Sequence, residues 1–428
     1  MADVRPFRAL RYDSQVVGGL DNIVSPPFDT ISADLQRSLY GRSPYNVVRL
    51  EGGERLPTDS GEDNRYTRAA AAMERWSQEG VLVRDSAPAF YLMRHSFSVR
   101  GKRAERRELM AAVRLEEYDR RVVLPHEYTR DEDKRDRLAL MKACRTNISP
   151  IMSLYSDVEG RVAAVLARVM ASPPADSFSD PGRQEYAQWR VDGPEDITAI
   201  REALESRPLY IADGHHRYET ALNYRRESGA GAPEAASEFV MMGLIEFSDP
   251  GLLVLPYHRV VSGLAADTLE RVRARLGETF DSSPYAASGV DSTAAFQAEV
   301  ERLGADGLAM GLLEPGDAGY SSLTLSGGVD AEGWGLLGGS EAWVLEDLVL
   351  KPILGESLER CLSYVHDGEE VVDRVRSGEA QMGFFLKPFP LDLFKEIMDR
   401  GERLPSKSTF FYPKLPTGIV MNPLEGWV

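Results

Sequence analysis

The sequence predicts a two-lobed α/β chain, with an α+β arrangement as the alternative, and three observations lead to this prediction. Strand-like apolar runs alternate along the chain with segments whose apolar residues recur at helical spacing. The 428 residues are enough for two or three domains, and the content of 43% apolar and 27% charged residues is typical of a globular protein. Ser228–Ser237 (SGAGAPEAAS) is the clearest linker, so we expect lobes at residues 1–235 and 236–428.

The first lobe is predicted to alternate helices and strands. Asn64–Gln78 is predicted to be an amphipathic helix, because Ala70, Met73 and Trp76 recur at helical spacing. Ser172–Arg183 is rich in Pro, Asp and Ser and is predicted to be a loop. The other predicted strands are 90–97, 109–115, 151–155 and 209–212, and the other predicted helices are 138–145, 161–170, 194–206 and 218–227.

The second lobe is predicted to contain strands at 252–260 and 381–387 and a helix at 343–350. Gly333–Gly338 matches the dinucleotide fingerprint GxGxxG, but it follows a Gly- and Asp-rich loop instead of a strand, so the required context is missing. The chain has no GxxxxGK[ST] loop, which excludes a Walker-type ATPase at motif level. It has no GxSxG elbow either, which argues against a hydrolase of that type.

The charge and the hydropathy of the sequence indicate which classes of binding partner to expect. The formal net charge is −17, which disfavours binding to nucleic acid. Arg100–Arg107 (RGKRAERR) is the densest basic run. It lies between two strand-like segments, so a solvated hairpin turn is favoured over a nucleic-acid patch. The N-terminal residues lack a signal-peptide core and no apolar run approaches membrane-spanning length, so we expect no membrane partner and a cytoplasmic location. Nothing in the sequence indicates an oligomeric state.

The two cysteines, Cys144 and Cys361, predict neither a disulfide framework nor a zinc site, because tetrahedral thiolate ligation needs paired cysteines at short spacing. Each lies in a predicted helix. We therefore expect both to be small buried hydrophobic residues.

Asp213-Gly214-His215-His216-Arg217 is the strongest candidate for chemistry. It follows the apolar run 209–212 and precedes a helix, the arrangement in which a glycine turn and a helix N-terminus receive phosphate. One Arg and two His at such a start are expected to form an anion cradle, while Asp213 holds Mg²⁺ or orients an imidazole. The alternative is that Asp213 caps the helix and the histidines lie on the surface.

A second polar group consists of Leu124–Thr129 (LPHEYT), which contains His126 and Glu127, followed by Lys134, Asp136, Arg137, Asn147 and Ser149. Such side chains suit general-base catalysis or contacts to nucleotide phosphates. The alternative, a solvated charged helix face, accounts well for residues 131–135 and less well for His126 and Glu127.

The third candidate is Lys407–Lys414 (KSTFFYPK), in which Lys407, Ser408 and Lys414 surround three aromatic residues. These side chains are candidates to close over a base or a phosphate. A packed aromatic terminal segment is the alternative.

Several of these blocks together resemble the bacterial and archaeal family called domain of unknown function 1015. The resemblance extends over essentially the whole chain and does not name a substrate. The blocks that carry it are Val24–Ser32, Pro44–Leu50, Leu124–Glu127, Asp136–Leu138, Asn147–Pro150, Ala212–Glu219 and Lys407–Leu415.

The Asp213–Arg217 block also resembles the phosphate motif of the ParB/sulfiredoxin superfamily, which implies a nucleotide-binding core of that type. Gly214, His216 and Arg217 match the Gly-Cys-His-Arg block of sulfiredoxin, but His215 replaces its reactive cysteine, so sulfinic-acid reduction is not expected. The Gly-Glu-Arg-Arg block of ParB is matched only at Gly214 and Arg217. Archaeal free-serine kinases carry an Asp-Gly-His-His-Arg block like this one, together with an upstream catalytic glutamate, for which Glu127 is the candidate.

These resemblances imply a nucleotide-dependent phosphotransferase that uses ATP or ADP with Mg²⁺ and acts on a small hydroxylated metabolite, with free L-serine as the best single substrate. Residues 214–217 would bind the phosphates, with Arg217 most important in the transition state, and Asp213 would hold Mg²⁺ or orient His215. Glu127 or Asp213 would take the hydroxyl proton, and Glu127 is expected to lie close to Asp213 and His215. The alternatives are a ParB-like nucleotide-binding regulator or partition protein, and a phosphatase or nucleotidase that uses the same cradle.

Overall fold

The computed structural model describes residues 1–229, 231–285, 292–305, 307–316 and 319–428, which form two compact units. Unit 1 comprises Met1–Pro125, Thr129–Leu253 and Pro413–Val428, and unit 2 comprises His126–Tyr128 and Val254–Tyr412. The boundary expected at residue 235 lies inside unit 1. The mixed α/β class predicted from the sequence is confirmed, and both units combine helices with a sheet.

The main sheet of unit 1 has nine strands in its described residues. Their bounds are β1 Val4–Arg5, β4 Phe90–Val99, β5 Lys102–Arg114, β6 Val123–Leu124, β8 Ile151–Tyr155, β9 Asp176–Ser179, β10 Glu185–Val191, β11 Leu209–Asp213 and β12 Phe239–Glu246. The order is β6-β11-β8-β12-β5-β4-β10-β9, with β1 beside β5. β11 runs parallel to β6 and β12 parallel to β8, whereas β8 and β11 are antiparallel.

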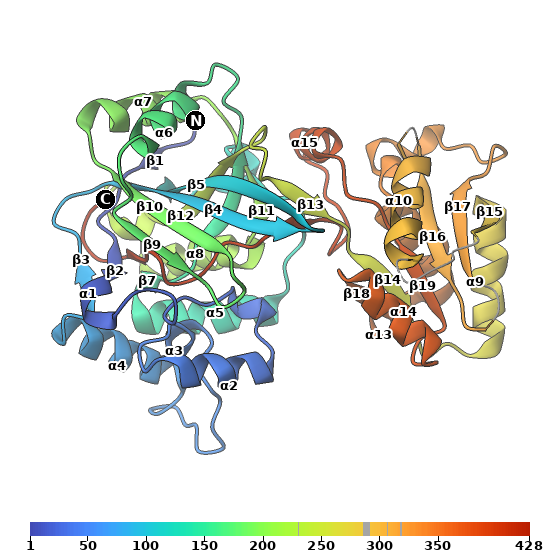
Figure 1. Cartoon of the computed structure of the whole chain (residues 1–428), viewed down its shortest axis with the longest axis horizontal. Coiled ribbons are helices and arrows are strands. Elements are labelled where there is room, and N and C mark those ends of the chain that lie inside the picture. The colour runs from blue at the N-terminus through green and yellow to red at the C-terminus, as the bar shows by residue number, and fades with distance from the viewer. Residues whose placement is uncertain (230, 286–291, 306, 317–318) are drawn as a thin grey trace. The chain divides into compact units, whose positions relative to one another are not determined.

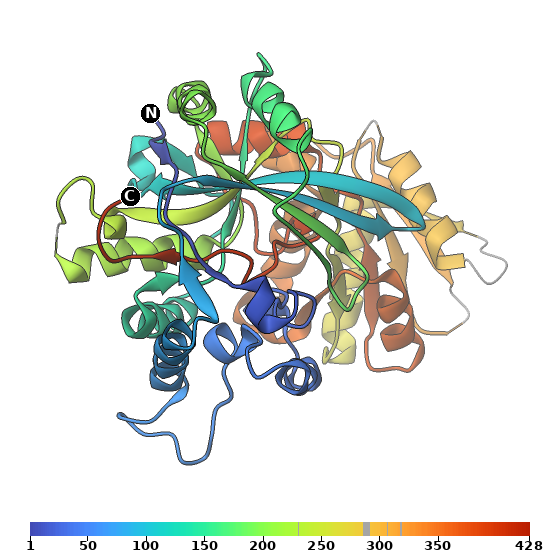
Figure 2. The ribbon, with the colours of Figure 1, turned by 60° about the vertical axis from the view of Figure 1, so that its left-hand side comes forward.

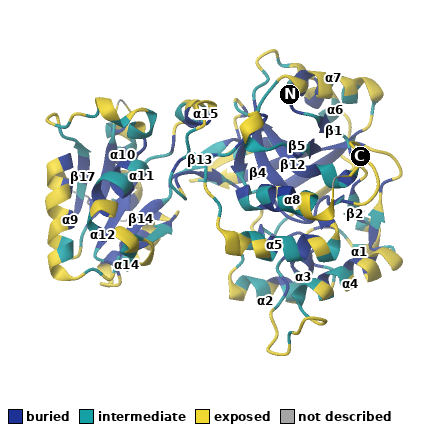
Figure 3. Cartoon of the chain, turned by 180° about the vertical axis from the view of Figure 1, so that it is seen from behind, coloured by how far each residue is buried: buried dark blue, intermediate teal, exposed yellow. Residues whose placement is uncertain are grey.

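Helices cover both faces of this sheet. Figure 1 shows α6 and α7 on one face and α8 on the other, with α5 and then α4, α3 and α2 beyond α8. Their bounds are α1 Ser14–Val17, α2 Ala33–Arg42, α3 Val48–Glu51, α4 Arg65–Gln78, α5 Asp131–Cys144, α6 Arg161–Met170, α7 Pro194–Glu205 and α8 His215–Ser228. Because both faces are covered, all five residues of β8 are buried, and the sheet is the most deeply buried part of the unit (Figure 3).

The C-terminal segment of unit 1 joins parts of the chain that are distant in sequence. Met421 bridges Leu10 and Thr417 bridges Ser25, while β21 (Asn422–Pro423) pairs with β7 (Thr146–Asn147). This segment is dark red in Figure 2. The N-terminal strand β2 (Leu10–Tyr12) pairs in turn with β3 (Leu82–Arg84). The C-terminal residues are therefore held against N-terminal and central blocks of unit 1.

Unit 2 is built on a six-stranded sheet in its described residues, in the order β15-β17-β16-β19-β14-β18, with antiparallel pairing throughout. The strands are β14 His258–Val261, β15 Phe280–Tyr285, β16 Ala309–Leu313, β17 Tyr320–Leu325, β18 Leu362–Val365 and β19 Met382–Phe385, and outside this sheet lie β13 Leu253–Leu255 and β20 Phe410–Tyr412. The helices are α9 Ala266–Thr279, α10 Ser292–Leu303, α11 Glu341–Trp343, α12 Lys351–Leu354, α13 Leu358–Cys361, α14 Gly368–Arg376 and α15 Leu391–Asp399.

The local predictions hold where the pattern is strong. The predicted helix at 64–78 is α4, and Asn64 begins it with a capping box. The predicted strand at 151–155 and helix at 161–170 are β8 and α6. The hairpin expected around Arg100–Arg107 is formed by β4 and β5.

Other local predictions were wrong in part. The loop expected at 172–183 contains β9, which pairs with β10. The strand expected at 252–260 is two strands, since Pro256 between β13 and β14 cannot donate a ladder hydrogen bond. The helix expected at 343–350 is α11 followed by a π-helix, Val344–Leu350. Gly333–Gly338 forms parts of two short 3₁₀ helices, so it lacks the strand-turn-helix context of a dinucleotide site.

The basic hairpin is largely neutralised by neighbouring carboxylates. Arg106 is fully buried and pairs with Glu108, Arg103 pairs with Glu185 at 2.6 Å, and Arg107 pairs with Asp249 at 2.9 Å. Each of these guanidinium groups already has a carboxylate partner on the protein, and the net charge of −17 repels DNA as a whole.

We therefore predict that the protein binds duplex DNA only weakly. At physiological salt the dissociation constant should be about 10⁻⁶ M or weaker, in the range of non-specific binding. Fluorescence anisotropy with a labelled duplex at several salt concentrations measures it. Sub-micromolar affinity with a steep salt dependence would contradict this prediction and favour the ParB-like alternative.

Both cysteines are free thiols and partly exposed, so they are less buried than expected. Burial nevertheless raises the pKa of the Cys144 thiol to about 12, which keeps it protonated at neutral pH. Within the described part of the chain, no helix combines the length and the apolar character needed to cross a bilayer.

Candidate functional site

The Asp213–Arg217 block forms a sharp turn between β11 and α8. Gly214 has φ +101° and is the residue from which α8 starts. A Cβ atom at this position would lie 2.9 Å from Nε of Arg217. Both the backbone conformation and the close packing of Arg217 therefore require glycine. Asp213 ends β11 and does not cap the helix, so the capping alternative for this residue is wrong.

Replacing Gly214 with alanine is predicted to destabilise the protein by about 1–3 kcal/mol, because a non-glycine residue here is strained and its Cβ displaces Arg217. Urea unfolding measures this change. Gly80→Ala is the matched control, since Gly80 also has a positive φ but no atom lies within 4 Å of the position that a Cβ would take there. Gly214→Ala should lower the free energy of unfolding more than Gly80→Ala does. An equal decrease in the two variants would contradict the conclusion that the packing of Arg217 requires glycine at position 214.

Arg217 connects the turn to the segment that leads into β8. Its buried guanidinium donates hydrogen bonds to the carbonyl oxygen of Pro150, to Oγ of Ser149 at 3.3 Å and to the carboxylate of Asp213. Three partners fix its orientation. Arg217 is thus part of the internal framework of the turn as well as a candidate phosphate ligand.

Asp213 has a second cationic partner, which comes from the far end of the sequence. Nζ of Lys414 lies 3.1 Å from Oδ1 of Asp213 and also pairs with the carboxylate of Asp29. We call Asp29, Asp213, Arg217 and Lys414 the Asp213 cluster. Its formal charges balance. A ligand phosphate would therefore have to compete with the two carboxylates for the cations.

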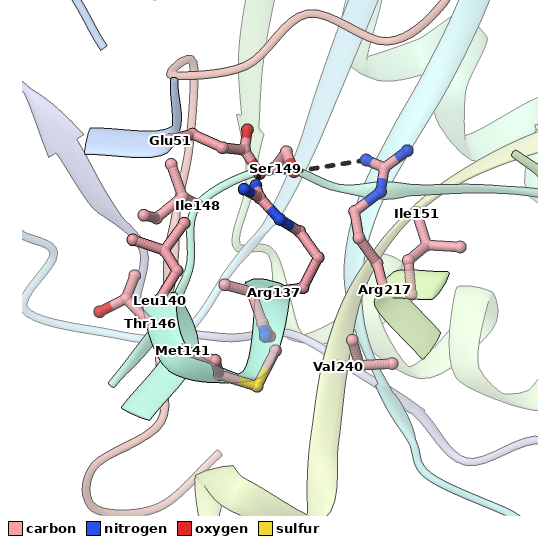
Figure 4. Close-up of a pocket in the computed structure, with 11 residues that line it drawn as sticks. Glu51, Arg137, Leu140, Met141, Thr146, Ile148, Ser149, Ile151, Arg217 and Val240 are labelled. Carbon is pink, nitrogen blue, oxygen red and sulfur yellow. Dashed lines mark hydrogen bonds and ion pairs between the residues drawn. The ribbon is translucent and has the colours of Figure 1, made fainter. Parts of the chain in front are cut away.

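Glu51, at the end of α3, organises a second buried group. Its carboxylate accepts hydrogen bonds from Oγ of Ser149 at 2.6 Å and from Oγ1 of Thr417 at 3.1 Å. Nη1 of Arg137 lies 3.6 Å from the same carboxylate. Figure 4 shows Arg137 and Arg217 on either side of Ser149, which is hydrogen-bonded to both Glu51 and Arg217. Ser149 thus connects this group to the Asp213 cluster.

Arg137 is held in place by an aromatic ring and a carboxylate. Its guanidinium carbon lies 3.7 Å from the ring centroid of Phe28, and its Nε donates to Asp136 at 2.9 Å. Burial lowers the pKa of this guanidinium, which indicates that its neighbours do not fully compensate its charge.

The two histidines differ in environment. His215 is buried at the start of α8. His216 is partly exposed, its Nε2 accepts a hydrogen bond from the amide of Arg130 at 3.0 Å, and it lies 3.4 Å from Asp133. His216 therefore faces the start of α5.

Two further predicted residues have structural contacts in unit 1. Lys134 on α5 pairs with Glu219 on α8 at 3.0 Å, which joins the two helices. Oδ1 of Asn147 accepts hydrogen bonds from the amide of Met241 and from the side chain of Asn422. Asn147 thus ties together β7, β12 and β21.

The remaining predicted residues, His126, Glu127, Lys407 and Ser408, are brought together in unit 2. The carboxylate of Glu127 accepts a hydrogen bond from the amide of Lys407 at 2.9 Å. Nε2 of His126 lies 3.0 Å from Oγ1 of Thr409, and Oγ of Ser408 donates to the carbonyl of Pro405. Since Glu127 belongs to unit 2 and Asp213 to unit 1, the expected proximity of these two residues stays a prediction.

The residues around Asp213 do not fit a preformed magnesium site. Two cationic side chains engage its carboxylate, and the described residues contain no group of three or more His, Cys, Asp or Glu side chains that could hold a metal ion. Magnesium commonly binds through one or two carboxylates together with substrate phosphates. Any Mg²⁺ here would depend on the nucleotide for most of its ligands.

Sequence reasoning missed Asp29, Glu51 and Thr417. Asp29 lies inside a family block, and Glu51 follows another block directly, so their positions carried a signal. Their roles come from contacts with residues up to several hundred positions away, which no local pattern reveals.

Comparisons with known proteins give one family match and several distant structural likenesses. A family model described as "Protein of unknown function (DUF1015)" matches residues 4–328. No match was found among curated proteins.

The solved structures that resemble the chain do so at low identity. "Free serine kinase in complex with AMP" has 15% identity and a TM-score of 0.35, over 73% of this chain and 91% of that chain. A conserved hypothetical protein from Pyrococcus furiosus has 15% identity and a TM-score of 0.36, over 73% and 94%. SbnI with C-terminal truncation from Staphylococcus aureus has 11% identity and a TM-score of 0.38, over 74% and 87%.

Proposed function

The chain belongs to the family described as domain of unknown function 1015, and we propose that it is a nucleotide-dependent phosphotransferase acting on a small hydroxylated metabolite. The observation that carries the proposal is the convergence of Arg217 and Lys414 on Asp213 at the glycine turn that starts α8. A turn of this kind, followed by a fourteen-residue helix, directs backbone N–H groups and a partial positive charge toward an anion.

In this proposal the nucleotide phosphates bind at residues 214–217, with Arg217 and Lys414 as the cationic ligands. Phosphoryl transfer depends mainly on positioning and charge neutralisation, so these two side chains would stabilise charge on the transferred group. Asp213 and Asp29 hold the cations in place before the ligand arrives. The balanced cluster also avoids leaving uncompensated positive charge in a partly buried site.

The proton of the acceptor hydroxyl needs a carboxylate base within hydrogen-bond reach. Glu127 is our first candidate and Asp213 the second. ATP and ADP are the proposed phosphate donors, Mg²⁺ would accompany them, and free L-serine is the first acceptor to test.

The experiment is a transfer assay read by phosphorus NMR. The purified protein is incubated with ATP, ADP or CTP, Mg²⁺ and either L-serine or a pool of small metabolites. We expect a new phosphomonoester signal that depends on both the protein and an acceptor. Release of inorganic phosphate without an acceptor would favour the phosphatase or nucleotidase alternative. Nucleotide binding without any turnover would favour the regulatory alternative.

A further inference from the structure

Three ionisable side chains on the main sheet of unit 1 are fully buried. They are His95 on β4 and Arg106 and Glu108 on β5, and each has an exposed fraction of 0%. Nε and Nη2 of Arg106 donate to one carboxylate oxygen of Glu108 at 2.9 and 2.7 Å, and Nδ1 of His95 lies 3.2 Å from the same oxygen. We call these three residues the Arg106 network. None of them belongs to the Asp213 cluster.

A buried ionic network of this kind contributes little net stability. Its charges lose their hydration on folding, so apolar side chains of similar volume often stabilise a protein as well or better. Here the cost of burial is larger still, because Oε2 of Glu108 is buried and accepts no hydrogen bond among the described residues. Stability therefore explains the network poorly, and its contacts beyond β4 and β5 indicate what else it does.

One such contact joins the network to the C-terminal segment of unit 1. Nη2 of Arg106 also donates to the carbonyl oxygen of Pro413 at 2.7 Å, although 307 positions separate the two residues. That carbonyl belongs to the peptide bond between Pro413 and Lys414. The hydrogen bond therefore fixes the orientation of the peptide from which Lys414 starts.

The residue after Lys414 is anchored on the same sheet. Leu415 packs directly over Gly243 of β12, where a Cβ atom would lie only 2.5 Å from Cδ1 of Leu415. Lys414 is thus held between a hydrogen bond at Pro413 and a close apolar contact at Leu415. Its own side chain is only 9% exposed, and its Nζ pairs with the two carboxylates of the Asp213 cluster.

We propose that Arg106 is a positioning residue of the phosphate site, which acts through the carbonyl of Pro413 to hold Lys414 in the conformation that binds the nucleotide phosphate. Glu108 and His95 orient the guanidinium of Arg106. Because a lysine side chain is long and flexible, fixing the backbone from which it starts reduces the entropy that is lost when its ammonium group binds an anion. The role of Lys414 as a phosphate ligand rests on the proposed function.

The test variant combines Arg106→Met with Glu108→Leu. It removes the ion pair as a whole, so the net charge is unchanged and the midpoint of urea unfolding should stay close to that of the wild type. We expect ATP and ADP to bind about threefold to tenfold more weakly by calorimetry, the order of effect of losing one hydrogen bond. Unchanged affinity in the folded variant overturns the proposal. If this variant does not fold, Arg106→Gln with Glu108→Gln provides the second reading, because glutamine keeps a hydrogen-bonded pair but is too short to reach Pro413 as well.

Lys387→Met combined with Glu341→Leu is the matched control. The two residues form a largely buried ion pair at 3.0 Å in unit 2, and Lys387 also donates to backbone carbonyl oxygens, those of Gly304 and Gly307. This control should leave nucleotide affinity unchanged. An equal loss of affinity in the two double variants would contradict a specific role of Arg106.

A thermodynamic cycle with Lys414→Met shows whether Arg106 acts through Lys414. If it does, the Arg106 and Glu108 substitutions should weaken nucleotide binding in the wild-type background and have little further effect in the Lys414→Met background. Additive losses would mean that Arg106 acts by another route, and they overturn the proposal. Unchanged affinity in Lys414→Met itself would contradict the phosphate-binding role of Lys414 in the proposed function.

The last measurement needs no nucleotide. Acetylation by acetic anhydride, followed by peptide mass spectrometry, reports how firmly Lys414 is held. Lys414 should react about threefold to tenfold faster in the Arg106→Met, Glu108→Leu variant than in the wild type, because loss of the hydrogen bond at Pro413 releases it. Lys142, whose side chain is 50% exposed, is the internal reference and should react at the same rate in both. An unchanged rate at Lys414 overturns the proposal, whereas a faster rate without nucleotide binding by any of the proteins would support the positioning and contradict the proposed function.

Discussion

Replacing Glu127 with glutamine is expected to lower the turnover of phosphate transfer by about 10²–10⁴-fold while leaving nucleotide affinity unchanged, because such a loss is typical when a general base is removed. This corresponds to about 2.7–5.4 kcal/mol in the activation free energy. The substitution is conservative for the local structure. The amide oxygen of glutamine can still accept the hydrogen bond that the amide of Lys407 donates to Glu127.

The comparison variant is Asp213→Asn. If Glu127 is the base, Asp213→Asn should act mainly on nucleotide affinity, since it disturbs the pairs with Arg217 and Lys414. Steady-state kinetics with ATP and the acceptor measures the turnover of each variant, and calorimetry measures its nucleotide affinity. Together they show which of the two carboxylates acts as the base. Normal turnover in a folded Glu127→Gln protein would remove Glu127 from catalysis and leave Asp213 as the remaining candidate.

Replacing Arg217 with alanine is expected to weaken nucleotide binding by about 1.5–3 kcal/mol, the range for a charge-assisted hydrogen bond. The structure adds a second effect. Loss of the guanidinium leaves the carbonyl of Pro150 and the carboxylate of Asp213 without this donor, so the free energy of unfolding should fall by about 1–3 kcal/mol. Calorimetry and urea unfolding measure the two changes separately.

Two controls accompany this variant. Arg226 lies on the same helix as Arg217 but pairs at the surface with Glu117. Arg226→Ala should therefore change neither the nucleotide affinity nor the free energy of unfolding by more than about 0.5 kcal/mol. Arg217→Lys keeps the charge but loses the fork of donors, so it should fall between alanine and wild type. Nucleotide affinity that is unchanged in folded Arg217→Ala would contradict the phosphate-binding role.

The sequence predicted those features that depend only on residues close together in the sequence. The cap at Asn64, the apolar run of β8 and the hairpin around Arg100–Arg107 are local patterns, and each is present in the structure. The turn at Gly214 belongs with them. A glycine between an apolar strand and a polar helix is a local signal, because the turn depends on the backbone conformation of that one residue.

The local sequence pattern did not predict elements that are determined by the strands with which they pair. β9 has a polar sequence, Asp176–Ser179, and is a strand because β10 lies beside it. The boundary of unit 1 was expected at 235, yet β12 beyond it pairs with β5 and β8 in the same sheet. Strand pairing is a long-range interaction, so composition at a single segment does not reveal it.

For the site, the sequence by itself determined the residue types and the local turn: a glycine between Asp213 and two histidines, with an arginine one helical turn after the aspartate. Only the tertiary structure placed Lys414 against Asp213 and Asp29, and Arg137 against Glu51. The physical reason is that these contacts join segments separated by as many as 385 positions. Their geometry is set by the packing of the C-terminal segment and α5 in unit 1, and not by propensities along the chain.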